Sequence, residues 1–326
     1  MGINSIKKSV IGVDISYYCT RYAIVDVRGN IIASDKFSTA DYPEFSQYID
    51  KLATSIMELA EAHGGYETIR SVGISCPSAN FVSGCIENAA NLPWKGVIPI
   101  SSILQDRIGM SVAVGNDAHT SALSERMFGS AHGMKDFIVV SIGVGLGSCI
   151  FTSGHECLGF GGYAGELGHI CVVDHGRRCN CGLSGCLESY AAAHGIVQTA
   201  KEIMEENDAP SLMRDIAELT PQIISDLCDQ GDALAIEVYK RTGYLLGLAL
   251  ATYASLVNPE AIILMGGISH AGHWLLDPTQ DSFEGHVFQN MRGKVKLVIS
   301  DQDDQDRNVL GASALAWEVQ EYSLFK

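Results

Sequence analysis

The order of predicted strands and helices runs through once and then begins again, and this repetition limits the fold more than any other feature of the sequence. The first round contains a strand, a hairpin and then alternating helices and strands: 9–14, 21–27 with 31–35, 44–62, 70–75, 100–108, 110–117 and 118–128. The second round opens on another strand pair: 137–145 with 147–154, 232–257, 261–267, 294–300 and 310–320. Two such rounds predict a duplicated α/β architecture with a cleft between the halves.

The composition excludes several classes of partner. With 326 residues and 47% hydrophobic side chains, the chain can form one large or two medium domains. A net charge of −16 argues against a direct nucleic-acid partner and against an anionic membrane, since both attract basic proteins. No apolar run reaches the roughly 20 residues that span a bilayer, and the N-terminus lacks a signal-peptide core. We therefore expect a cytoplasmic protein, in which the acidic segment DQDDQD (301–306) forms a solvated loop.

Only one group among the ten cysteines is dense enough to hold a metal ion. Cys179, Cys181 and Cys186 form a C-x-C-x4-C pattern that follows His169, and glycines between them allow a tight loop. One imidazole and three thiolates suit the closed, four-ligand structural sites of zinc. The alternative is a set of reduced, unligated thiols, which would be prone to oxidation. The spacing favours a structural Zn²⁺ with these four ligands over a disulfide framework.

Two glutamates flank the predicted metal-binding segment, residues 169–186, which we call the metal loop. Glu166 precedes His169 by three residues, so on a helical turn their side chains share a face. Glu188 follows Cys186 by two residues, so the same metal would also position this carboxylate. Ionised carboxylates offer several acceptor sites to hydroxyl groups, which favours a polyhydroxylated ligand. Taken alone, each glutamate could equally be an exposed surface residue.

Several motifs together resemble the ROK family of sugar kinases, sugar-responsive repressors and unassigned proteins. GGYAGELGHI (161–170) followed by CNCGLSGCLESY (179–190) is similar to the signature of that family. Its Asn-Asp-Ala, Asn-Leu-x-Trp and late glycine motifs resemble further segments: VGNDAHTSALSE (114–125), NLPWKGVIPI (91–100) and NPEAIILMGGIS (258–269). The resemblance covers nearly the whole chain. It implies the duplicated ribonuclease-H-like, two-lobed α/β fold of actin and hexokinase, with lobes at 1–117 plus 309–326 and at 118–308.

The resemblance also implies roles for individual residues. Asp117 would be the catalytic base, which takes the proton of the sugar hydroxyl that attacks the γ-phosphate of ATP. Taken alone, an aspartate here would more often be a residue that begins or caps a helix. The sugar would be bound by Asn116, Glu166, His169 and Glu188. The nucleotide and its Mg²⁺ would lie against Asp14, Gly143, Val144, Gly145, Gly266 and Gly267. Family analogy further implies a homodimer or a homotetramer.

The nucleotide side departs from the family pattern at three places. The family's opening Asp-x-Gly-Gly-Thr hairpin has Ser16, Tyr17 and Tyr18 here in place of its Gly-Gly-Thr, and side chains there hinder the approach of a phosphate. Val144 replaces a threonine in GVGLG (143–147), so a hydroxyl is missing. Met265 replaces the first of three late glycines. The sugar and zinc motifs show no comparable change.

These departures leave two functions open. The first is ATP- and Mg²⁺-dependent phosphorylation of a hexose or an N-acetylhexosamine. The second is a sugar-binding sensor with little or no kinase activity, as in the repressors of the family. Those repressors carry an N-terminal helix-turn-helix domain, and the eight residues before Ser9 are too few to form one. Because Asp117 has no evident use in a sensor, we favour the kinase.

Overall fold

The chain divides into two compact units that follow the two rounds of the sequence pattern. The structure is a computed structural model that describes residues 7–89 and 92–323. Unit 1 comprises Met1–Gly133 and Gln302–Lys326, and unit 2 comprises Met134–Asp301. The division thus differs from the predicted lobes at residues 118–133 and 302–308, which belong to unit 1. Asn91, which opens the predicted Asn-Leu-x-Trp segment, lies outside the described residues.

Unit 1 is built on a five-stranded sheet with the order β3-β2-β1-β4-β8. The first three strands form an antiparallel meander: β1 (Ser9–Ile15), β2 (Cys19–Asp26) and β3 (Ile31–Ser38). Two further strands extend the sheet in parallel with β1: β4 (Ile69–Ser75) and β8 (Val112–Gly115). A small antiparallel sheet follows β4 in the chain and contains β5 (Ala79–Asn80), β6 (Cys85–Glu87) and β7 (Val97–Ile98). The predicted strands of the first round are therefore confirmed.

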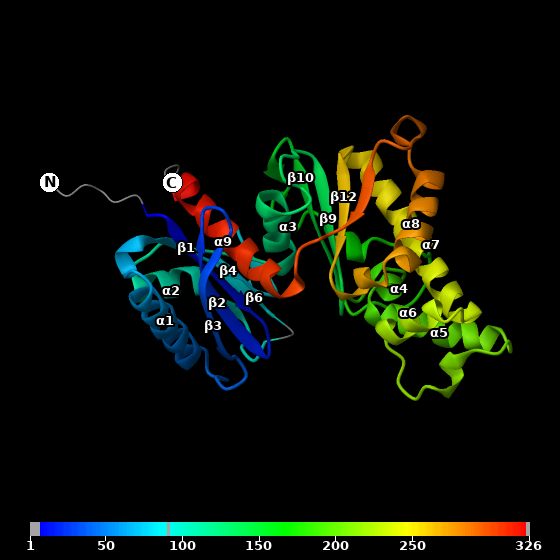
Figure 1. Cartoon of the computed structure of the whole chain (residues 1–326), viewed down its shortest axis with the longest axis horizontal. Helices are drawn as coiled ribbons and strands as arrows, with labels where there is room; N and C mark the ends of the chain where they lie inside the picture. The colour runs from blue at the N-terminus through cyan, green and yellow to red at the C-terminus, as the bar shows by residue number, and fades with distance from the viewer. Residues whose placement is uncertain (1–6, 90–91, 324–326) are drawn as a thin grey trace. The chain divides into compact units, whose positions relative to one another are not determined.

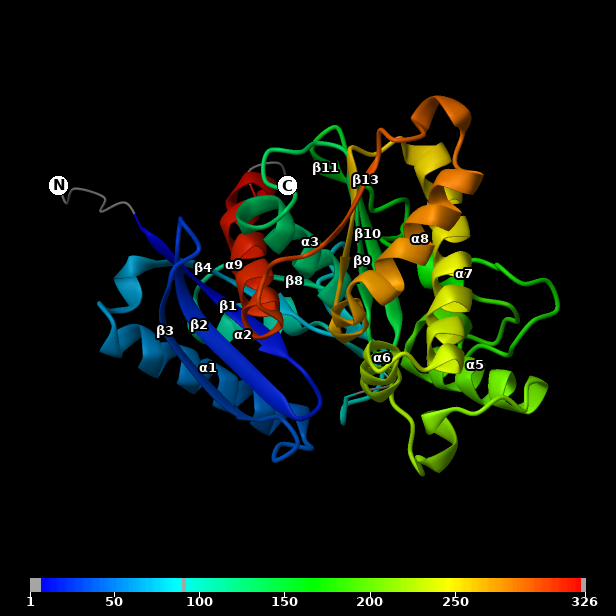
Figure 2. The same cartoon turned by 45° about the vertical axis from the view of Figure 1, so that its right-hand side comes forward.

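Helices cover both faces of this sheet, as Figures 1 and 2 show. One face packs against α1 (Phe45–Ala62) and α2 (Ile100–Ile108), and the 3₁₀ turn η1 (Tyr66–Thr68) leads into β4. The other face packs against α9 (Asp304–Ser323), which lies beside α3 (Asp117–Phe128). Gly73 allows α9 to pack closely against the sheet, because it has no side chain. A Cβ atom at this position would collide with the carbonyl of Ala312.

The acidic segment 301–306 is not wholly a loop, so that prediction was wrong. Helix α9 begins at Asp304 and includes the helix predicted at 310–320. Acidic side chains are favourable at the N-terminus of a helix because they interact with its dipole. A run of carboxylates that suggests solvent exposure is therefore also compatible with the first turn of a buried helix.

Unit 2 repeats the arrangement with a sheet of order β11-β10-β9-β12-β13. Its antiparallel strands are β9 (Phe137–Ile142), β10 (Leu146–Thr152) and β11 (His155–Glu156). Its parallel strands are β12 (Ala261–Met265) and β13 (Lys296–Ile299). The strand order matches that of unit 1 position by position. This match confirms the predicted duplication, and the chain has the duplicated ribonuclease-H-like fold.

The helices of unit 2 pack around one apolar core. They are α4 (Glu188–Ala191), α5 (Ala193–Glu206), α6 (Pro221–Asp229), α7 (Ala233–Val257) and α8 (His273–His286). Short 3₁₀ turns complete the unit: η2 (Leu167–His169), η3 (Leu212–Asp215), η4 (Gly267–Ala271) and η5 (Gln289–Met291). Asp232 caps the 25-residue helix α7, because its carboxylate accepts hydrogen bonds from the backbone N–H groups of Leu234 and Ala235. It runs alongside α8 (Figure 2).

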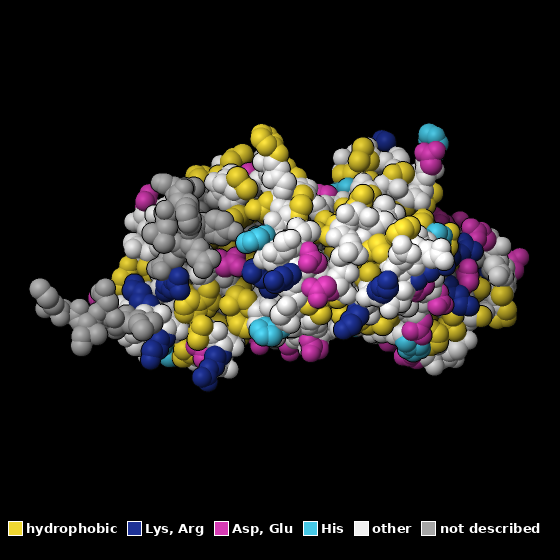
Figure 3. Space-filling view, turned by 90° about the horizontal axis from the view of Figure 1, so that it is seen from above, with side chains coloured by type: hydrophobic (Ala, Val, Ile, Leu, Met, Phe, Trp, Pro, Cys, Tyr) yellow, Lys and Arg dark blue, Asp and Glu magenta, His cyan; other side chains and the backbone are white. Residues whose placement is uncertain are grey.

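Charged side chains of both signs lie on the visible surface. Figure 3 shows lysine and arginine side chains scattered over the visible face, with acidic side chains among them. Within the described part of the chain, no helix combines the length and the apolar character that crossing a bilayer requires.

Candidate active site and metal centre

The four predicted metal ligands converge in unit 2. His169 ends η2, and the three cysteines lie on the loop between η2 and α4. One ligand atom from each of His169, Cys179, Cys181 and Cys186 lies within 4.8 Å of all the others. Two isolated antiparallel bridges hold the loop in shape, one between Cys171 and Cys186 and one between Arg178 and Ser184. The loop closes tightly because Gly185 has a φ of 81° and a Cβ there would collide with the carbonyl of Val173.

The distances within this cluster fit a tetrahedral metal ion. The Sγ atoms of Cys181 and Cys186 are 3.7 Å apart, and the Sγ of Cys179 is 3.8 Å from Nδ1 of His169. A tetrahedral zinc ion with Zn–S bonds of about 2.3 Å would separate two thiolate ligands by roughly 3.8 Å. The cysteines are free thiols rather than disulfides. Donor type and spacing therefore both fit zinc.

Arg177, which the sequence reading did not single out, fastens the metal loop to the helices that follow it. Its guanidinium donates hydrogen bonds to the carboxylate of Glu202, the Thr199 hydroxyl and the carbonyls of Ser189 and Gly195. All five of its N–H groups are thus used. The guanidinium also lies over the ring of Tyr190, 4.5 Å from its centroid. Its hydrogen bonds lower the pKa of Glu202, so this pair remains ionised.

Glu188 connects the metal loop to the loop between β9 and β10. Its Oε2 atom accepts a hydrogen bond of 3.0 Å from the backbone N–H of Leu146. Its Oε1 atom lies 3.8 Å from the Sγ of Cys179. One carboxylate therefore contacts a predicted metal ligand and the predicted phosphate loop at once. Glu166, three residues before His169, lies close to Tyr253 of α7; burial, together with the charge of Glu166, raises the pKa of that tyrosine.

The predicted phosphate-binding glycines of unit 2 lie at neighbouring strand ends. The turn that contains Val144 closes with a hydrogen bond from the Gly143 N–H to the Gly145 carbonyl, and the side chain of Val144 is 88% exposed. Gly266 and Gly267 follow β12, whose last residue Met265 pairs with Ser141 of β9. Carboxyl ends of adjacent parallel strands meet at one edge of a sheet, which is where such folds bind ligands. Both glycine segments are therefore at the same edge.

Met265 departs from the family pattern without changing this edge. Its side chain is only 1% exposed and packs inside unit 2. The methionine is thus a core residue at the end of β12. Of the three departures found in the sequence, this one carries the least weight against nucleotide binding.

The predicted catalytic base lies at the corresponding edge of unit 1. Asn116 caps α3, with its Oδ1 accepting a 2.7 Å hydrogen bond from the His119 N–H. Asp117 begins the helix and accepts a 3.0 Å hydrogen bond from the Ala118 N–H. The helix-start role weighed for Asp117 is thus present in the structure. Its side chain still reaches solvent, while desolvation by the surrounding protein raises its pKa.

Asp14 lies at the same edge of the sheet. It pairs with Ser75 of β4, and Ser75 pairs with Gly115 of β8, which directly precedes Asn116. Burial raises the pKa of Asp14 to about 6; a hydrogen bond from Asn308 opposes this rise, and the charge of Asp117 adds to it. Asn308 also accepts a 3.2 Å hydrogen bond from the Ser121 hydroxyl, so it links β1, α3 and α9. No sequence signal marked Asn308, since it lies 294 residues from Asp14.

The β1–β2 turn differs from a phosphate hairpin in its hydrogen bonds as well as in its sequence. The Ser16 hydroxyl donates to the carbonyl of Cys19 at 2.9 Å and accepts from the Cys19 N–H at 3.2 Å. The Ser16 N–H also donates to the Cys19 carbonyl. Tyr17 and Tyr18 extend from the turn, 44% and 79% exposed, with their rings edge to face at 4.9 Å. The turn satisfies its own backbone groups and presents aromatic rings outward.

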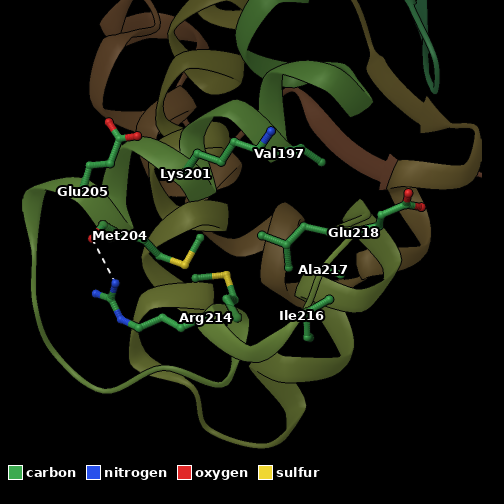
Figure 4. A pocket seen from close by; sticks show the side chains of 10 residues that line it. Val197, Lys201, Met204, Glu205, Arg214, Ile216, Ala217 and Glu218 are labelled. Carbon is green, nitrogen blue, oxygen red and sulfur yellow. Dashed lines mark hydrogen bonds between the residues drawn. The ribbon is translucent and has the colours of Figure 1, made fainter.

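A separate pocket of about 620 Å³ in unit 2 contains none of the predicted site residues. Figure 4 shows it between α5 and the segment around η3, with Met204 pointing inward and the carboxylates of Glu205 and Glu218 pointing away. The guanidinium of Arg214 donates a 3.1 Å hydrogen bond to the Met204 carbonyl at its edge. This pocket therefore does not coincide with the metal loop.

Comparison with known proteins identifies relatives along the whole chain. A model described as the ROK family matches residues 10–319. The glucokinase of Halalkalibacterium halodurans is 30% identical over 322 residues, which are 97% of this chain and 97% of that protein. The DNA-binding transcriptional dual regulator NagC of Escherichia coli is 32% identical over 212 residues, which are 65% of this chain and 51% of NagC. A solved ROK family glucokinase from Streptomyces griseus, in complex with glucose and AMPPNP, is 30% identical; the match covers 95% of this chain and 99% of that one, with a TM-score of 0.75.

Proposed function

The chain belongs to the ROK family, and from this premise we propose that it is an ATP-dependent sugar kinase that phosphorylates a hexose or an N-acetylhexosamine. The coarser part of this proposal, phosphoryl transfer from ATP to a sugar, is supported by glucokinase relatives that align over nearly their full length. The finer part concerns the substrate, the base and the metal. It rests on the residues of this chain.

Sugar recognition is assigned to Asn116, Glu166, His169 and Glu188. Carboxylates accept hydrogen bonds from hydroxyl groups, a metal-bound imidazole donates through its remaining N–H, and Asn116 can both donate and accept. The observation that carries the proposal is the position of Glu188, whose two oxygen atoms face Leu146 N–H and Cys179 Sγ. A sugar bound to this carboxylate would lie next to the glycine loop assigned to phosphate. That proximity is what a phosphoryl-transfer enzyme requires.

Proton removal is assigned to Asp117. In phosphoryl transfer the attacking hydroxyl loses its proton late, so a carboxylate of modest basicity is sufficient if it is well placed. Helix α3 fixes the backbone of Asp117, and the Asn116 cap fixes the start of that helix. Desolvation raises the pKa of Asp117 above the usual range of an aspartate, which makes the carboxylate a stronger base.

Nucleotide binding is assigned to Asp14 and to the glycine segments that contain Gly143, Val144, Gly145, Gly266 and Gly267. ATP with Mg²⁺ supplies the phosphoryl group when it is bound. Backbone N–H groups of glycine-rich turns bind phosphate oxygens without interference from side chains. Val144 points into solvent, so the loss of a hydroxyl there leaves the backbone of the turn unchanged.

A structural zinc ion is assigned to His169, Cys179, Cys181 and Cys186. Their spacing fits tetrahedral zinc, and the closed set of four protein ligands suits a structural site. Zinc would fix the metal loop and, through the contact of Cys179 with Glu188, the orientation of the sugar-binding carboxylate. The metal acts on the substrate only through this positioning.

A sensor function is the second candidate, because residues of the β1–β2 turn hydrogen-bond to each other and present side chains where the family has a phosphate-binding hairpin. The Ser16 hydroxyl hydrogen-bonds to the backbone N–H and carbonyl of Cys19, and Ser16, Tyr17 and Tyr18 stand in place of the family's Gly-Gly-Thr. NagC, a transcriptional regulator, is also among the relatives. A sensor would bind a sugar at Glu166 and Glu188 and would not bind ATP.

Two measurements on the wild-type protein separate these functions. Mass spectrometry should detect a phosphorylated product after incubation with Mg²⁺-ATP and one member of a panel of hexoses and N-acetylhexosamines. Thermal melting should show stabilisation by that sugar and by Mg²⁺-ATP, since saturation at a hundredfold excess over Kd contributes about 2.7 kcal/mol. Stabilisation by a sugar alone, with no product from any sugar and no effect of ATP, would favour the sensor and contradict the kinase.

A further inference from the structure

Cys171 lies directly opposite Cys186, one of the proposed zinc ligands, in an antiparallel bridge. Hydrogen bonds flank the pair on both sides: Val172 N–H donates to the Gly185 carbonyl at 2.9 Å, and Leu187 N–H donates to the Ile170 carbonyl at 3.0 Å. The two cysteines do not hydrogen-bond to each other. In this non-hydrogen-bonded type of pair the Cα atoms are about 4.5 Å apart and both side chains lie on the same face.

This geometry allows a disulfide without rearrangement of the loop. Disulfides connect Cα atoms that are roughly 4.4 to 6.8 Å apart. The Cys171 side chain is exposed, and its Sγ lies 3.5 Å from the Val173 carbonyl. It also lies beside Gly185, where a Cβ would approach this sulfur to 3.0 Å. Because residue 185 is a glycine, the space between Cys171 and the chain leading to Cys186 is open.

Cys171 has no place in the ligand set itself. The cluster of possible ligands among the described residues contains His169 and three other cysteines, and Cys171 is not among them. Cys171 is therefore an accessible thiol next to a metal centre that does not need it. Exposure, together with thiolate character, makes a thiol susceptible to oxidation by peroxide.

We propose that Cys171 and Cys186 are a redox-modification site, in which hydrogen peroxide drives formation of a disulfide between them. Peroxide oxidises the Cys171 thiol to a sulfenic acid and is itself reduced to water. The Cys186 sulfur then attacks the Cys171 sulfur, an S–S bond forms, the S–O bond breaks, and the oxygen leaves as a second water with the remaining protons. The protein loses two hydrogens in total. Cys186 can then no longer serve as a metal ligand.

The loss of Cys186 as a metal ligand rests on the proposed zinc site, whereas formation of the disulfide does not. Within the cluster, Cys181 and Cys186 are themselves only 3.7 Å apart, so they form the competing pair. When zinc is bound, Cys179, Cys181 and Cys186 are all engaged as ligands. Among these four cysteines, peroxide then reacts first with Cys171, and the Cys186 sulfur opposite it attacks in the second step. The zinc-loaded protein should therefore form the bond between Cys171 and Cys186 in preference to the competing one.

The experiment treats the full-length protein with hydrogen peroxide, both as purified and after removal of metal by a chelator. Peptide mapping without reductant should find Cys171 linked to Cys186, together with loss of two hydrogens from the intact mass. A colorimetric chelator should detect zinc release from the wild type. Release should be several-fold slower in Cys171→Ser, and unchanged in Cys157→Ser, which removes another exposed cysteine of unit 2. Thermal melting of each variant checks that it is folded.

Two results would overturn the proposal. One is a map in which Cys186 is linked only to Cys179 or Cys181. The other is zinc release from Cys171→Ser at the wild-type rate. Absence of zinc in the purified protein would contradict the metal assignment instead, and the disulfide would still be tested by the map of the metal-free protein.

Discussion

Among single residues, Glu188 and Asp14 carry the most information about function. Glu188 connects the metal loop to the glycine loop of unit 2 through Leu146 and Cys179. Asp14 keeps a raised pKa because it is buried near a second carboxylate, Asp117. Buried acids that destabilise the folded state are common at functional sites, where the cost is offset by activity. Each residue permits a separate test.

Replacing Glu188 by Gln should weaken sugar binding by roughly ten- to a hundredfold, because a charged hydrogen-bond acceptor for a hydroxyl contributes about 1.5 to 3 kcal/mol. The amide oxygen of Gln can still accept from Leu146 N–H, so the substitution changes charge more than structure. Isothermal calorimetry with the sugar identified in the panel measures the effect. Glu205→Gln, an exposed change on α5, should leave Kd unaltered. Equal affinity of Glu188→Gln and wild type would place the sugar elsewhere.

Replacing Asp14 by Asn should stabilise the protein near neutral pH. Because the folded pKa of Asp14 is raised to about 6, the folded state binds this proton more tightly than the unfolded chain, and stability falls as the pH rises from about 4 through about 6. The variant should therefore gain up to about 3 kcal/mol at roughly pH 7.5, and the gain should shrink toward pH 4. Urea unfolding at both pH values measures this. If Asp14→Asn and the wild type had the same free energy of unfolding at the higher pH, the Asp14 carboxylate would not destabilise the folded state there.

Among the elements, the metal loop of unit 2 and the β1–β2 turn of unit 1 are held in different ways. The metal loop is held by its two bridges, by the network of Arg177 and, in the proposal, by zinc. The β1–β2 turn is held by the hydrogen bonds between Ser16 and Cys19 and by one from the Thr39 N–H to the Tyr18 carbonyl, and it projects two tyrosines. We expect the first element to depend on its ligands for stability and the second to tolerate change.

Substituting Cys181 by Ser should remove most of the bound zinc and lower the melting temperature, because a closed zinc site contributes directly to folding. Cys181 is exposed, so the substitution leaves the apolar core untouched. Elemental analysis of protein purified without chelator measures the metal content. Cys157→Ser is the control and should retain full metal. A Cys181→Ser protein with wild-type zinc content and stability would disprove the ligand assignment.

Replacing Tyr17 by Gly together with Tyr18 by Thr should leave ATP-dependent turnover unchanged or raise it. The change removes two exposed rings and keeps the Ser16 hydrogen bonds of the turn. Phosphate then approaches the backbone with less obstruction. Steady-state kinetics at varied ATP measures the effect on KM. A rise in KM for ATP, with an unchanged melting temperature, would mean instead that the tyrosines contribute to nucleotide binding.

For the molecule as a whole, sequence patterns were enough for the architecture and insufficient for the contacts. Alternating apolar segments predicted the strands and the duplication, because each buried strand leaves a local pattern. The start of α9 was missed because acidic residues suit both a loop and a first helical turn. His169 and the clustered cysteines were recognisable by donor type. The pairing of Asn308 with Asp14 and of Cys171 with Cys186 depends on chain folding and leaves no local signal.

The central claim is that Asp117 acts as a base in phosphoryl transfer from ATP to a sugar. The most direct test is the rate of sugar-dependent ADP release by the wild type and by Asp117→Asn, with the exposed Asp174→Asn as a control. We predict that Asp117→Asn loses turnover while sugar affinity stays close to that of the wild type, because the carboxylate acts on a proton that moves only in the reaction. The control should behave as the wild type does. ADP release by Asp117→Asn at the wild-type rate would contradict this account.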